Sequence, residues 1–401
     1  MVRAAVTGLG PVSSIGVGAA AFADALRAGR SGISRITGFD PSGFPYQNAG
    51  EVRGFDPAAH LRRLDPARWG RSSRFAASAA RLALEDGGLD AGAFDPRRAH
   101  AVIGTTSGES QVAEALTAQI VDGGFAAQDP ALLSQLPAGR LANAVSAELG
   151  LRGESLTIAT ACSASNYALG YAYDLLVTGE ADVVLAGGAD SVCRWAHAGF
   201  HRMGALAEKA CAPFDRNRSG ILTGEGGAVL LLETFEHARA RGARVYAELL
   251  GYGLNCDARH PVAPDAASVA ACMRLAHRNS GVKPEDVDYI CAHGTGTPTN
   301  DLVEGKAVLE VFGDRPPPIS SIKSMIGHTM GAACGFGAIA GVLAIDQGFL
   351  PPTVNWAEPD PGLPGIDAVP NTARTAQVRV VQNDGFAFGG NNAIVMLGAP
   401  E

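Results

Sequence analysis

One cysteine, two histidines and one lysine stand in segments rich in small residues, and together they could perform acyl chemistry. These residues are Cys162, His293, Lys323 and His328. A cysteine thiolate attacks thioesters readily, whereas a neutral imidazole donates an N–H to a carbonyl oxygen. Two such donors aimed at one thioester oxygen would stabilise the enolate that forms when a malonyl group loses carbon dioxide. The set therefore predicts acyl transfer coupled to decarboxylation.

Cys162 lies where an apolar run, residues 156–160, gives way abruptly to a helical pattern. A sharp strand-to-helix turn presents its side chain to a substrate, and the small neighbours Ala161 and Ser163 leave room for a thioester. The free N–H groups of the first helical turn would favour a thiolate and lower the pKa of the cysteine. On this segment alone, an ordinary buried cysteine ahead of a helix fits equally well.

The two histidines occur in glycine-rich contexts. His293 directly follows the hydrophobic run 287–291, and Gly294 and Gly296 let the backbone approach a ligand closely. A histidine that closes a strand through a backbone hydrogen bond is the alternative for His293. His328 precedes the small-residue helix 331–344. A hydrolase needs one histidine as base and an acid to orient it, so a pair of histidines points to a different task.

Alternating strands and helices must position these residues. The apolar patterns predict strands and helices in the order expected for an α/β protein, with a βαβ unit around residues 156–186. We expect two α/β halves, residues 1–241 and 242–401, joined at a helix over 235–241. Strands are predicted at 4–8, 101–104, 156–159, 183–186, 246–250, 287–291, 319–322 and 393–397, and helices at 22–28, 72–85, 165–177, 266–279 and 331–344.

Composition limits the class of protein. The chain of 401 residues is 47% hydrophobic, enough for a large core, and its net charge of -8 disfavours nucleic-acid binding. Seven cysteines without metal-ligand spacing argue against a disulfide framework and against a structural zinc site. The first residues lack the pattern of a signal peptide, and polar residues interrupt each candidate membrane segment. We therefore expect a cytoplasmic protein that does not bind a membrane and needs neither a metal nor an organic cofactor.

Several motifs together resemble the β-ketoacyl-[acyl-carrier-protein] synthases of the thiolase superfamily, in the elongating class with a Cys-His-His triad. The resemblance covers essentially the whole chain. It implies a thiolase-like fold, in which two α/β halves related by a pseudo-twofold axis form five layers, αβαβα, around the active site. The matching motifs are residues 6–10, 160–164, 213–215, 224–228, 292–298, 324–333 and 385–392.

The resemblance also implies a role for each matching residue. Cys162 matches the nucleophile, and its backbone N–H with that of Phe388 would form an oxyanion hole. His293 and His328 match the pair that binds the malonyl thioester, and Lys323 matches the lysine that supports His328. Phe388 also matches a gating phenylalanine. Asp301 and Glu304 match acidic residues near the lysine, and the substrate pocket is expected to include Phe200, Phe386, Thr295 and Thr297, with Trp195 and Met203 nearby.

Two departures from the family pattern favour a specialised enzyme over the general elongase. The family normally has a glutamate nine residues after the second histidine, but this chain has Gly337, which would leave Asp301 and Glu304 to balance Lys323. In the terminal loop, Ala387 replaces a glycine and Asn391 replaces a threonine. An alanine there would stiffen the gate.

The expected partner is an acyl carrier protein carrying acyl and malonyl groups. Such carriers are small acidic proteins, and a local basic cluster would steer their docking. The second expected partner is a subunit of the same fold, in a homodimer or in a heterodimer with a homologue that resembles a chain-length factor. The docking candidates are Arg62, Arg63, Arg68, Arg71 and Arg74, with Arg202 and Lys209 as further candidates.

Other functions remain open at this point. A thiolase that uses coenzyme A would need a second catalytic cysteine, which the segment around Lys323 and His328 does not offer. A scaffold subunit without activity would have no reason to keep Cys162, His293 and His328, although Gly337 leaves that alternative open. The sequence does not distinguish fatty acid from type II polyketide synthesis, and it does not define the acyl chain.

Overall fold

The centre of the molecule is a mixed β-sheet to which both halves of the sequence contribute. The computed structural model describes residues 2–401 and within them forms an eleven-stranded sheet. Ten strands follow one another in the order β12-β11-β15-β16-β10-β1-β9-β7-β5-β6, and β2 pairs with β1. The bounds are β1 Ala4–Ser13, β2 Gly16–Val17, β5 Ala99–Gly104, β6 Ser155–Ile158, β7 Val183–Asp190, β9 Gly226–Thr234, β10 Ala247–Cys256, β11 Tyr289–Cys291, β12 Ile319–Ser320, β15 Val380–Phe386 and β16 Asn391–Gly398.

The two halves of this sheet have the same topology. In the first half, β5 is parallel to β6 and β7, while β9 is antiparallel to β7 and β1. In the second half, β11 is parallel to β12 and β15, while β16 is antiparallel to β15 and β10. The halves join where the beginning of β1 pairs with the beginning of β10. This repetition is the internal symmetry that the resemblance implies.

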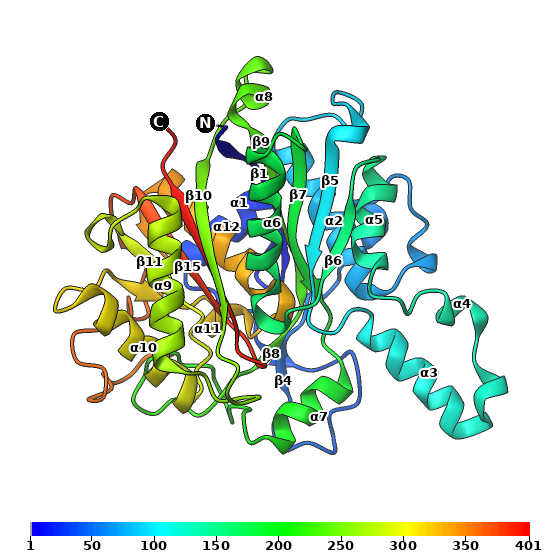
Figure 1. The fold of residues 1–401 in the computed structure, drawn as a ribbon. Helices are drawn as coiled ribbons and strands as arrows, with labels where there is room; N and C mark the ends of the chain where they lie inside the picture. The colour runs from blue at the N-terminus through cyan, green and yellow to red at the C-terminus, as the bar shows by residue number, and fades with distance from the viewer. Residues whose placement is uncertain (1) are drawn as a thin grey trace.

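Helices complete a five-layer arrangement (Figure 1). Helices α6 (Ala164–Val177) and α12 (Ala333–Gln347) form the central layer, and each contacts strands of both half-sheets. Helices α2 (Arg71–Asp86) and α5 (Arg140–Leu149) cover the outer face of the first half-sheet. Helices α9 (Ala266–Ser280) and α10 (Pro298–Phe312) cover that of the second. The thiolase-like fold expected from the sequence is thus confirmed.

Helix α12 is apolar on all sides because it is enclosed on all sides. Its residues 333–344 are all buried. The stretch Met330–Gln347 has a mean hydropathy of 1.4, enough for a membrane span by length and composition, but 83% of it is buried inside the protein. The central helix of a globular core satisfies the same criterion, so this stretch is weak evidence for a membrane segment.

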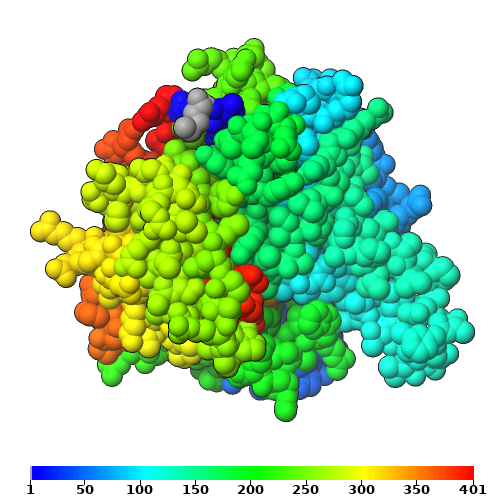
Figure 2. Space-filling view, viewed as in Figure 1, coloured from blue at the N-terminus to red at the C-terminus, as the bar shows by residue number. Residues whose placement is uncertain are grey.

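An arm of two helices extends from the body of the molecule. It consists of α3 (Ser110–Gly123), the short turn Phe125–Ala127 and α4 (Pro130–Leu133), and it projects at the lower right in Figures 1 and 2. Its apolar side chains are unusually accessible, since Val121 and Phe125 are each 78% exposed. Exposed apolar side chains of this size commonly mark a surface that another protein covers.

The remaining elements connect the layers. Among them, α7 (Arg194–Arg202) and β8 (Thr223–Gly224) lie at the lower end of the molecule in Figure 1. The other bounds are α1 Ala19–Arg27, α8 Phe235–Ala240, α11 Lys323–Ile326, β3 Ser34–Arg35, β4 Asn48–Gly50, β8 Thr223–Gly224, β13 Phe349–Leu350 and β14 Arg374–Thr375.

The predicted elements agree with the structure in position and differ at their ends. Helix α2 extends one residue beyond the predicted 72–85 at each end. Strand β12 ends at Ser320, two residues early, because the chain turns there into α11. Helix α8 stands where the two halves were expected to join, and the boundary at residue 241 remains a prediction.

Candidate active site

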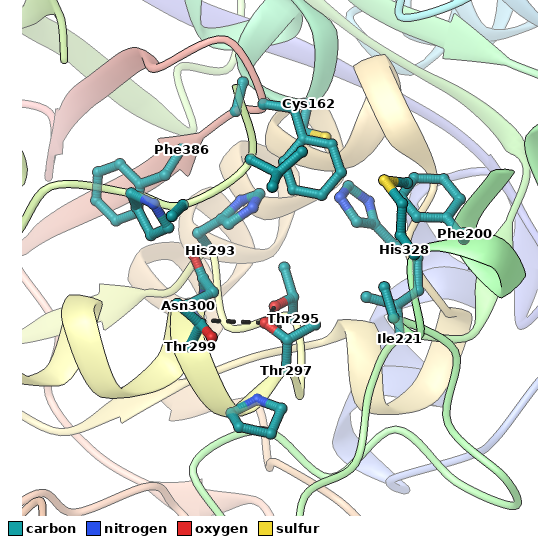
Figure 3. Close-up of a pocket in the computed structure, with 18 of the residues that line it drawn as sticks. Cys162, Phe200, Ile221, His293, Thr295, Thr297, Thr299, Asn300, His328 and Phe386 are labelled. Carbon is teal, nitrogen blue, oxygen red and sulfur yellow. Dashed lines mark hydrogen bonds between the residues drawn. The ribbon is translucent and has the colours of Figure 1, made fainter. Parts of the chain in front are cut away.

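A cavity of about 220 Å³ brings together residues that are far apart in the sequence. Cys162, His293 and His328 all line it, and Figure 3 shows the cysteine sulfur above the two imidazole rings. The short turns that precede α6 and α12, Ala161–Ser163 and Met330–Ala332, contact each other beside this cavity. Five more of the expected residues line the cavity as well: Phe200, Thr295, Thr297, Phe386 and Phe388.

The turn that carries Cys162 is conformationally strained. Ala161 has a φ of 49°, in the left-handed region that residues with a β-carbon rarely adopt. One such residue costs roughly 1 kcal/mol, and strain of this kind is concentrated at functional sites. The turn brings Cys162 to the N-terminal end of α6 and exposes 6% of the residue, on the side of the cavity.

Burial holds Cys162 as a thiol in the cavity. Burial raises the pKa of its thiol to about 11; Lys323 opposes this, and so do the backbone N–H groups of Phe388 and Cys162 itself. The backbone N–H groups thus lower this pKa, as the sequence predicts, but burial outweighs them, so the net shift is upward and the thiolate expected from the sequence is not favoured. Both N–H groups favour negative charge at the sulfur, and the oxyanion hole that the sequence predicts for them remains a prediction.

We predict that alkylation of Cys162 by iodoacetamide accelerates about tenfold per pH unit between pH 7 and pH 10, because the reactive thiolate fraction grows at that rate below the thiol pKa. Peptide mass spectrometry separates this site from the exposed Cys256. A rate that levels off near neutral pH would show that Cys162 is a preformed thiolate.

His328 is fixed as a hydrogen-bond donor toward the cavity. The backbone N–H of Met330 donates to its Nδ1 over 3.2 Å, so Nδ1 carries no proton. Burial and the charge of Lys323 hold the pKa of His328 well below its usual range, and the ring is therefore neutral. A neutral ring with an unprotonated Nδ1 has its proton on Nε2.

His293 is neutral for similar reasons. Burial, with Lys323 and His328, holds its pKa well below the usual range. Its ring stands at 82° to the ring of His328, with the centroids 5.5 Å apart, and at 67° to that of Phe386. Within residues 2–401 its Nδ1 is buried without a hydrogen-bond partner. Two uncharged imidazoles thus face one cavity, as enolate stabilisation requires.

Lys323 lies behind the histidines, at the start of α11. Its ammonium donates a hydrogen bond to the carbonyl oxygen of His293, and the residue is 4% exposed. Its charge also lowers the pKa of both histidines. The lysine therefore acts on the site through the backbone of His293 and through its electric field.

The two acidic residues organise the backbone of the segment that follows β11. Glu304 accepts hydrogen bonds from the N–H groups of His293 and Gly294, each at 2.7 Å. Asp301 accepts from the N–H groups of Thr295 at 3.0 Å and Phe214 at 2.9 Å, and it lies 3.9 Å from Arg218. Asp301 thus faces an arginine, which corrects the expectation that it balances Lys323 together with Glu304.

The loop of residues 387–390, which the sequence predicts to be a gate, is anchored to a neighbouring loop. The N–H of Gly389 donates to the Pro261 carbonyl at 2.8 Å, and the N–H of Asp257 donates to Gly390 at 2.9 Å. Phe388 is 38% exposed, and its ring lies 6.0 Å from that of Phe200 between centroids. Gly389 and Gly390 both have positive φ, so the loop keeps two residues that can change conformation easily.

The sequence did not indicate several further residues of the cavity. Ile221 and Asn300 line it, and so do residues of the loop 260–264. Asn300 could have been predicted from the sequence, because it lies in the first turn of α10. There its N–H donates to the side chain of Thr297, which caps the helix. The loop has no comparable signal. Met203 lines the cavity as expected, whereas Trp195 is 51% exposed and lies outside the lining.

The expected docking arginines differ in their surroundings. Arg71 forms an ion pair with the buried Glu225 and is a structural residue. Arg62 is exposed and pairs with Glu85, while Arg63 and Arg68 are exposed. Arg74 is half-buried. The exposed Arg202 directly precedes Met203, which lines the cavity, and the exposed Lys209 follows on the same segment. Of the expected docking residues, these two are therefore closest in sequence to a residue of the cavity lining.

Two family models match the chain. The model of the β-ketoacyl synthase N-terminal domain matches residues 1–238, and that of the β-ketoacyl synthase C-terminal domain matches residues 246–357.

Curated relatives and a solved structure agree with these matches. The 3-oxoacyl-[acyl-carrier-protein] synthase 2 of Coxiella burnetii is 37% identical, over 98% of both chains. The putative polyketide beta-ketoacyl synthase 1 of Streptomyces halstedii is 39% identical, over 100% of this chain and 98% of its own. Among solved structures, the ishigamide ketosynthase/chain length factor matches with a TM-score of 0.98 and 47% identity, over 100% of this chain and 99% of its own.

Proposed function

The chain belongs to the β-ketoacyl synthase family, and from this we propose that it extends acyl chains by decarboxylative condensation with a malonyl group on an acyl carrier protein. It is an acyltransferase. The observation that carries the proposal is the meeting of Cys162 with two neutral histidines in one cavity. A thioester nucleophile and a pair of N–H donors are the two components that this reaction needs.

The first half-reaction loads the cysteine. The sulfur of Cys162 attacks the carbonyl carbon of an acyl thioester while its proton leaves, and the backbone N–H groups of Cys162 and Phe388 bind the developing oxyanion. The carrier thiol is released with a proton, and the acyl group remains on the cysteine. Because the free thiol is protonated, proton removal and sulfur attack are linked in this step.

The second half-reaction forms the carbon-carbon bond. The N–H groups of His293 and His328 bind the thioester oxygen of the malonyl group, which loses carbon dioxide and becomes an enolate. The enolate carbon attacks the acyl group on Cys162, and the cysteine leaves as a thiolate that takes up one proton. Each cycle thus releases one carbon dioxide and consumes one proton.

The carrier protein approaches the mouth of this cavity. We propose that two exposed residues, Arg202 at the end of α7 and Lys209 after it, contribute most to docking, and that Arg62, Arg63 and Arg68 add to the positive field. Charges of this kind steer an acidic partner and raise its association rate.

A second subunit covers the arm and the edge of the sheet. Strand β6 is the last strand of the sheet order, and its Leu156 is 37% exposed. An uncovered edge strand with apolar side chains favours pairing with another chain. We propose that the partner is a homologue that resembles a chain-length factor, a choice supported by the ishigamide ketosynthase/chain length factor.

We predict that Phe125→Glu prevents association with the second subunit, because a charge would be buried where an apolar ring, now 78% exposed, is covered. Native mass spectrometry of the co-expressed subunits measures this. The matched control Val2→Glu places a charge on a 43% exposed apolar position away from the arm, and it should leave assembly intact. If Phe125→Glu still assembles, the interface lies elsewhere.

The second part of the proposal concerns the biosynthetic pathway in which the protein acts. The polyketide names of the Streptomyces halstedii relative and the ishigamide structure, together with Gly337, support specialised polyketide synthesis over general fatty acid synthesis. We propose that the protein acts in the cytoplasm, where its carrier-bound substrates would be made.

Intact-mass spectrometry tests the function. The protein, with and without a co-expressed second subunit, is mixed with acyl carrier proteins of varied chain length and then with malonyl carrier protein. We expect an acyl adduct on the protein that disappears into a carrier-bound product two carbons longer. If no adduct forms in either case, the proposal is wrong and a scaffold role takes its place.

A further inference from the structure

Asp190, the last residue of β7, is a buried carboxylate outside the cavity lining. It is 1% exposed and accepts four hydrogen bonds, all from uncharged donors. Three come from the loop after β5: the Thr105 hydroxyl at 2.8 Å and the N–H groups of Thr106 at 2.7 Å and Ser107 at 3.0 Å. Burial raises the pKa of Asp190 to about 6 against these donors, so the group is a carboxylate at neutral pH.

The fourth donor belongs to the turn Met330–Ala332, which follows His328. The N–H of Gly331 donates to Oδ2 of Asp190 at 2.7 Å. A β-carbon at Gly331 would lie 2.5 Å from backbone atoms of Thr105, so the turn packs directly against the loop after β5. Asp190 therefore joins three segments at one point: its own strand, this loop and the turn.

The carbonyl of Gly331 is held as well. The hydroxyl of Ser165 donates to it, and Ser165 is fully buried in the first turn of α6, three residues after Cys162. A β-carbon at Gly188 in β7 would lie 2.3 Å from this hydroxyl oxygen and 2.6 Å from the Gly331 oxygen, so a side chain there would displace the bond. Two buried side chains, Asp190 and Ser165, thus fix both backbone polar groups of Gly331, and we name this pair the Gly331 clamp.

The residue before Gly331 is conformationally strained. Met330 has a φ of 54°, in the left-handed region that residues with a β-carbon rarely adopt. Such a conformation persists only where the surrounding structure imposes it. The N–H of Met330 is also the group that donates to Nδ1 of His328 at 3.2 Å. The direction of that N–H therefore depends on what holds the turn.

The backbone of His328 is fixed independently of the clamp. Its N–H donates to the Leu222 carbonyl at 2.6 Å, and its carbonyl accepts from the Gly224 N–H at 2.8 Å. These two bonds place the residue, but they do not select which ring nitrogen carries the proton. The Met330 N–H makes that selection, because a donor directed at Nδ1 excludes a proton there.

We propose that Asp190 and Ser165 are positioning residues for His328. By holding Gly331 they keep the N–H of Met330 directed at Nδ1 of the imidazole, and this fixes the ring proton on Nε2. The role rests on the proposed function, in which the Nε2–H of His328 binds the malonyl thioester oxygen. Asp190 and Ser165 act through the turn and do not line the cavity themselves.

Nitrogen NMR of the histidine side chains tests the tautomer without any turnover. A ring nitrogen that carries a proton and one that does not resonate at well separated frequencies, and exchange between the two tautomers brings those frequencies together. The signals of His328 are identified by their absence in His328→Ala. We expect a single tautomer, protonated on Nε2, in the natural protein. We expect averaged frequencies in Asp190→Asn, because the amide replaces one accepting oxygen with a donor.

Glu51→Gln is the matched control. Glu51 is also a buried carboxylate held by uncharged donors, the N–H groups of Thr37 and Gly38 and the Thr37 hydroxyl, each at 2.8 Å. Its replacement should lower the thermal stability as Asp190→Asn does but leave the His328 signals unchanged. Unchanged signals in folded Asp190→Asn overturn the proposal, and so does an equal change in the control.

Ser165→Ala is the second variant, because it removes only the hydroxyl that holds the Gly331 carbonyl. It should move the His328 signals in the same direction as Asp190→Asn. If Asp190→Asn does not fold, Ser165→Ala decides by the same criterion: averaged frequencies support the clamp, and unchanged signals overturn it.

Activity measurements distinguish failure of this role from failure of the proposed function. Release of carbon dioxide from malonyl carrier protein should fall about tenfold in Asp190→Asn, less than after loss of the whole donor, while the acyl adduct on Cys162 still forms. In a His328→Ala background, Asp190→Asn should add little, because the group that it positions is already absent. Independent, multiplying losses overturn the positioning role. If the natural protein releases no carbon dioxide, the proposed function fails while the NMR result still stands.

Discussion

Replacement of Cys162 by alanine is expected to abolish acyl transfer and to lower condensation by about 10⁴-fold or more, as removal of a catalytic nucleophile does. The structure gives the reason: Cys162 lines the cavity, at a strained turn before the N-terminal end of α6. Intact-mass spectrometry after incubation with acyl carrier protein should show no adduct on the variant.

The control for this variant is a cysteine that is equally buried. The sulfur of Cys334 lies 3.2 Å from the carbonyl oxygen of Cys162, yet Cys334 is not part of the cavity lining. Cys334→Ala should form the adduct. Malonyl decarboxylation should persist in Cys162→Ala, because the two histidines remain. An acyl adduct on Cys162→Ala would place the nucleophile elsewhere.

Replacement of His328 by alanine should have the second-largest effect, a loss of about 10²–10³-fold in malonyl decarboxylation, the usual result of removing one oxyanion donor. His328 is the better defined donor, since the Met330 N–H forces its proton onto Nε2. Loading of Cys162 uses other donors, so the acyl adduct should still form on the variant.

Two measurements separate these steps. Intact mass follows the adduct, and carbon dioxide release follows decarboxylation. The variant His328→Asn keeps one N–H donor in the same place and should retain more activity than His328→Ala. If His328→Ala loses the adduct but not decarboxylation, the roles assigned to the two half-reactions are reversed.

The sequence predicted the elements and residues whose signals are local. Helix α2 could be located because its buried side chains recur at helical spacing, and β7 because it begins as an apolar run. Cys162, His293 and His328 could be identified because each stands among small residues next to an apolar segment. The structure brings the three to one cavity. Their catalytic roles remain proposals.

What the sequence could not predict depends on contacts across the fold. Strand β15 was missed because its centre is Gln382, Asn383 and Asp384, which read as a surface loop although all three are buried. Their partners His277 and Asn166 come from distant helices. The pKa of Cys162 was misjudged for the same reason, since burial is a tertiary property. Arg71 was misassigned because Glu225 lies far away in the sequence.

The shared central layer has a consequence for synthesis of the chain. Helix α6 contacts β10 and β16, and α12 contacts β7 and β9, so each half completes the core of the other. On the ribosome, the first 240 residues would emerge with one side of α6 uncovered until the last strands are made. The nascent chain should therefore depend on chaperones during this interval, and limited proteolysis of the finished protein should not release a stable half. Although two family models divide the sequence, we expect it to fold as one cooperative unit.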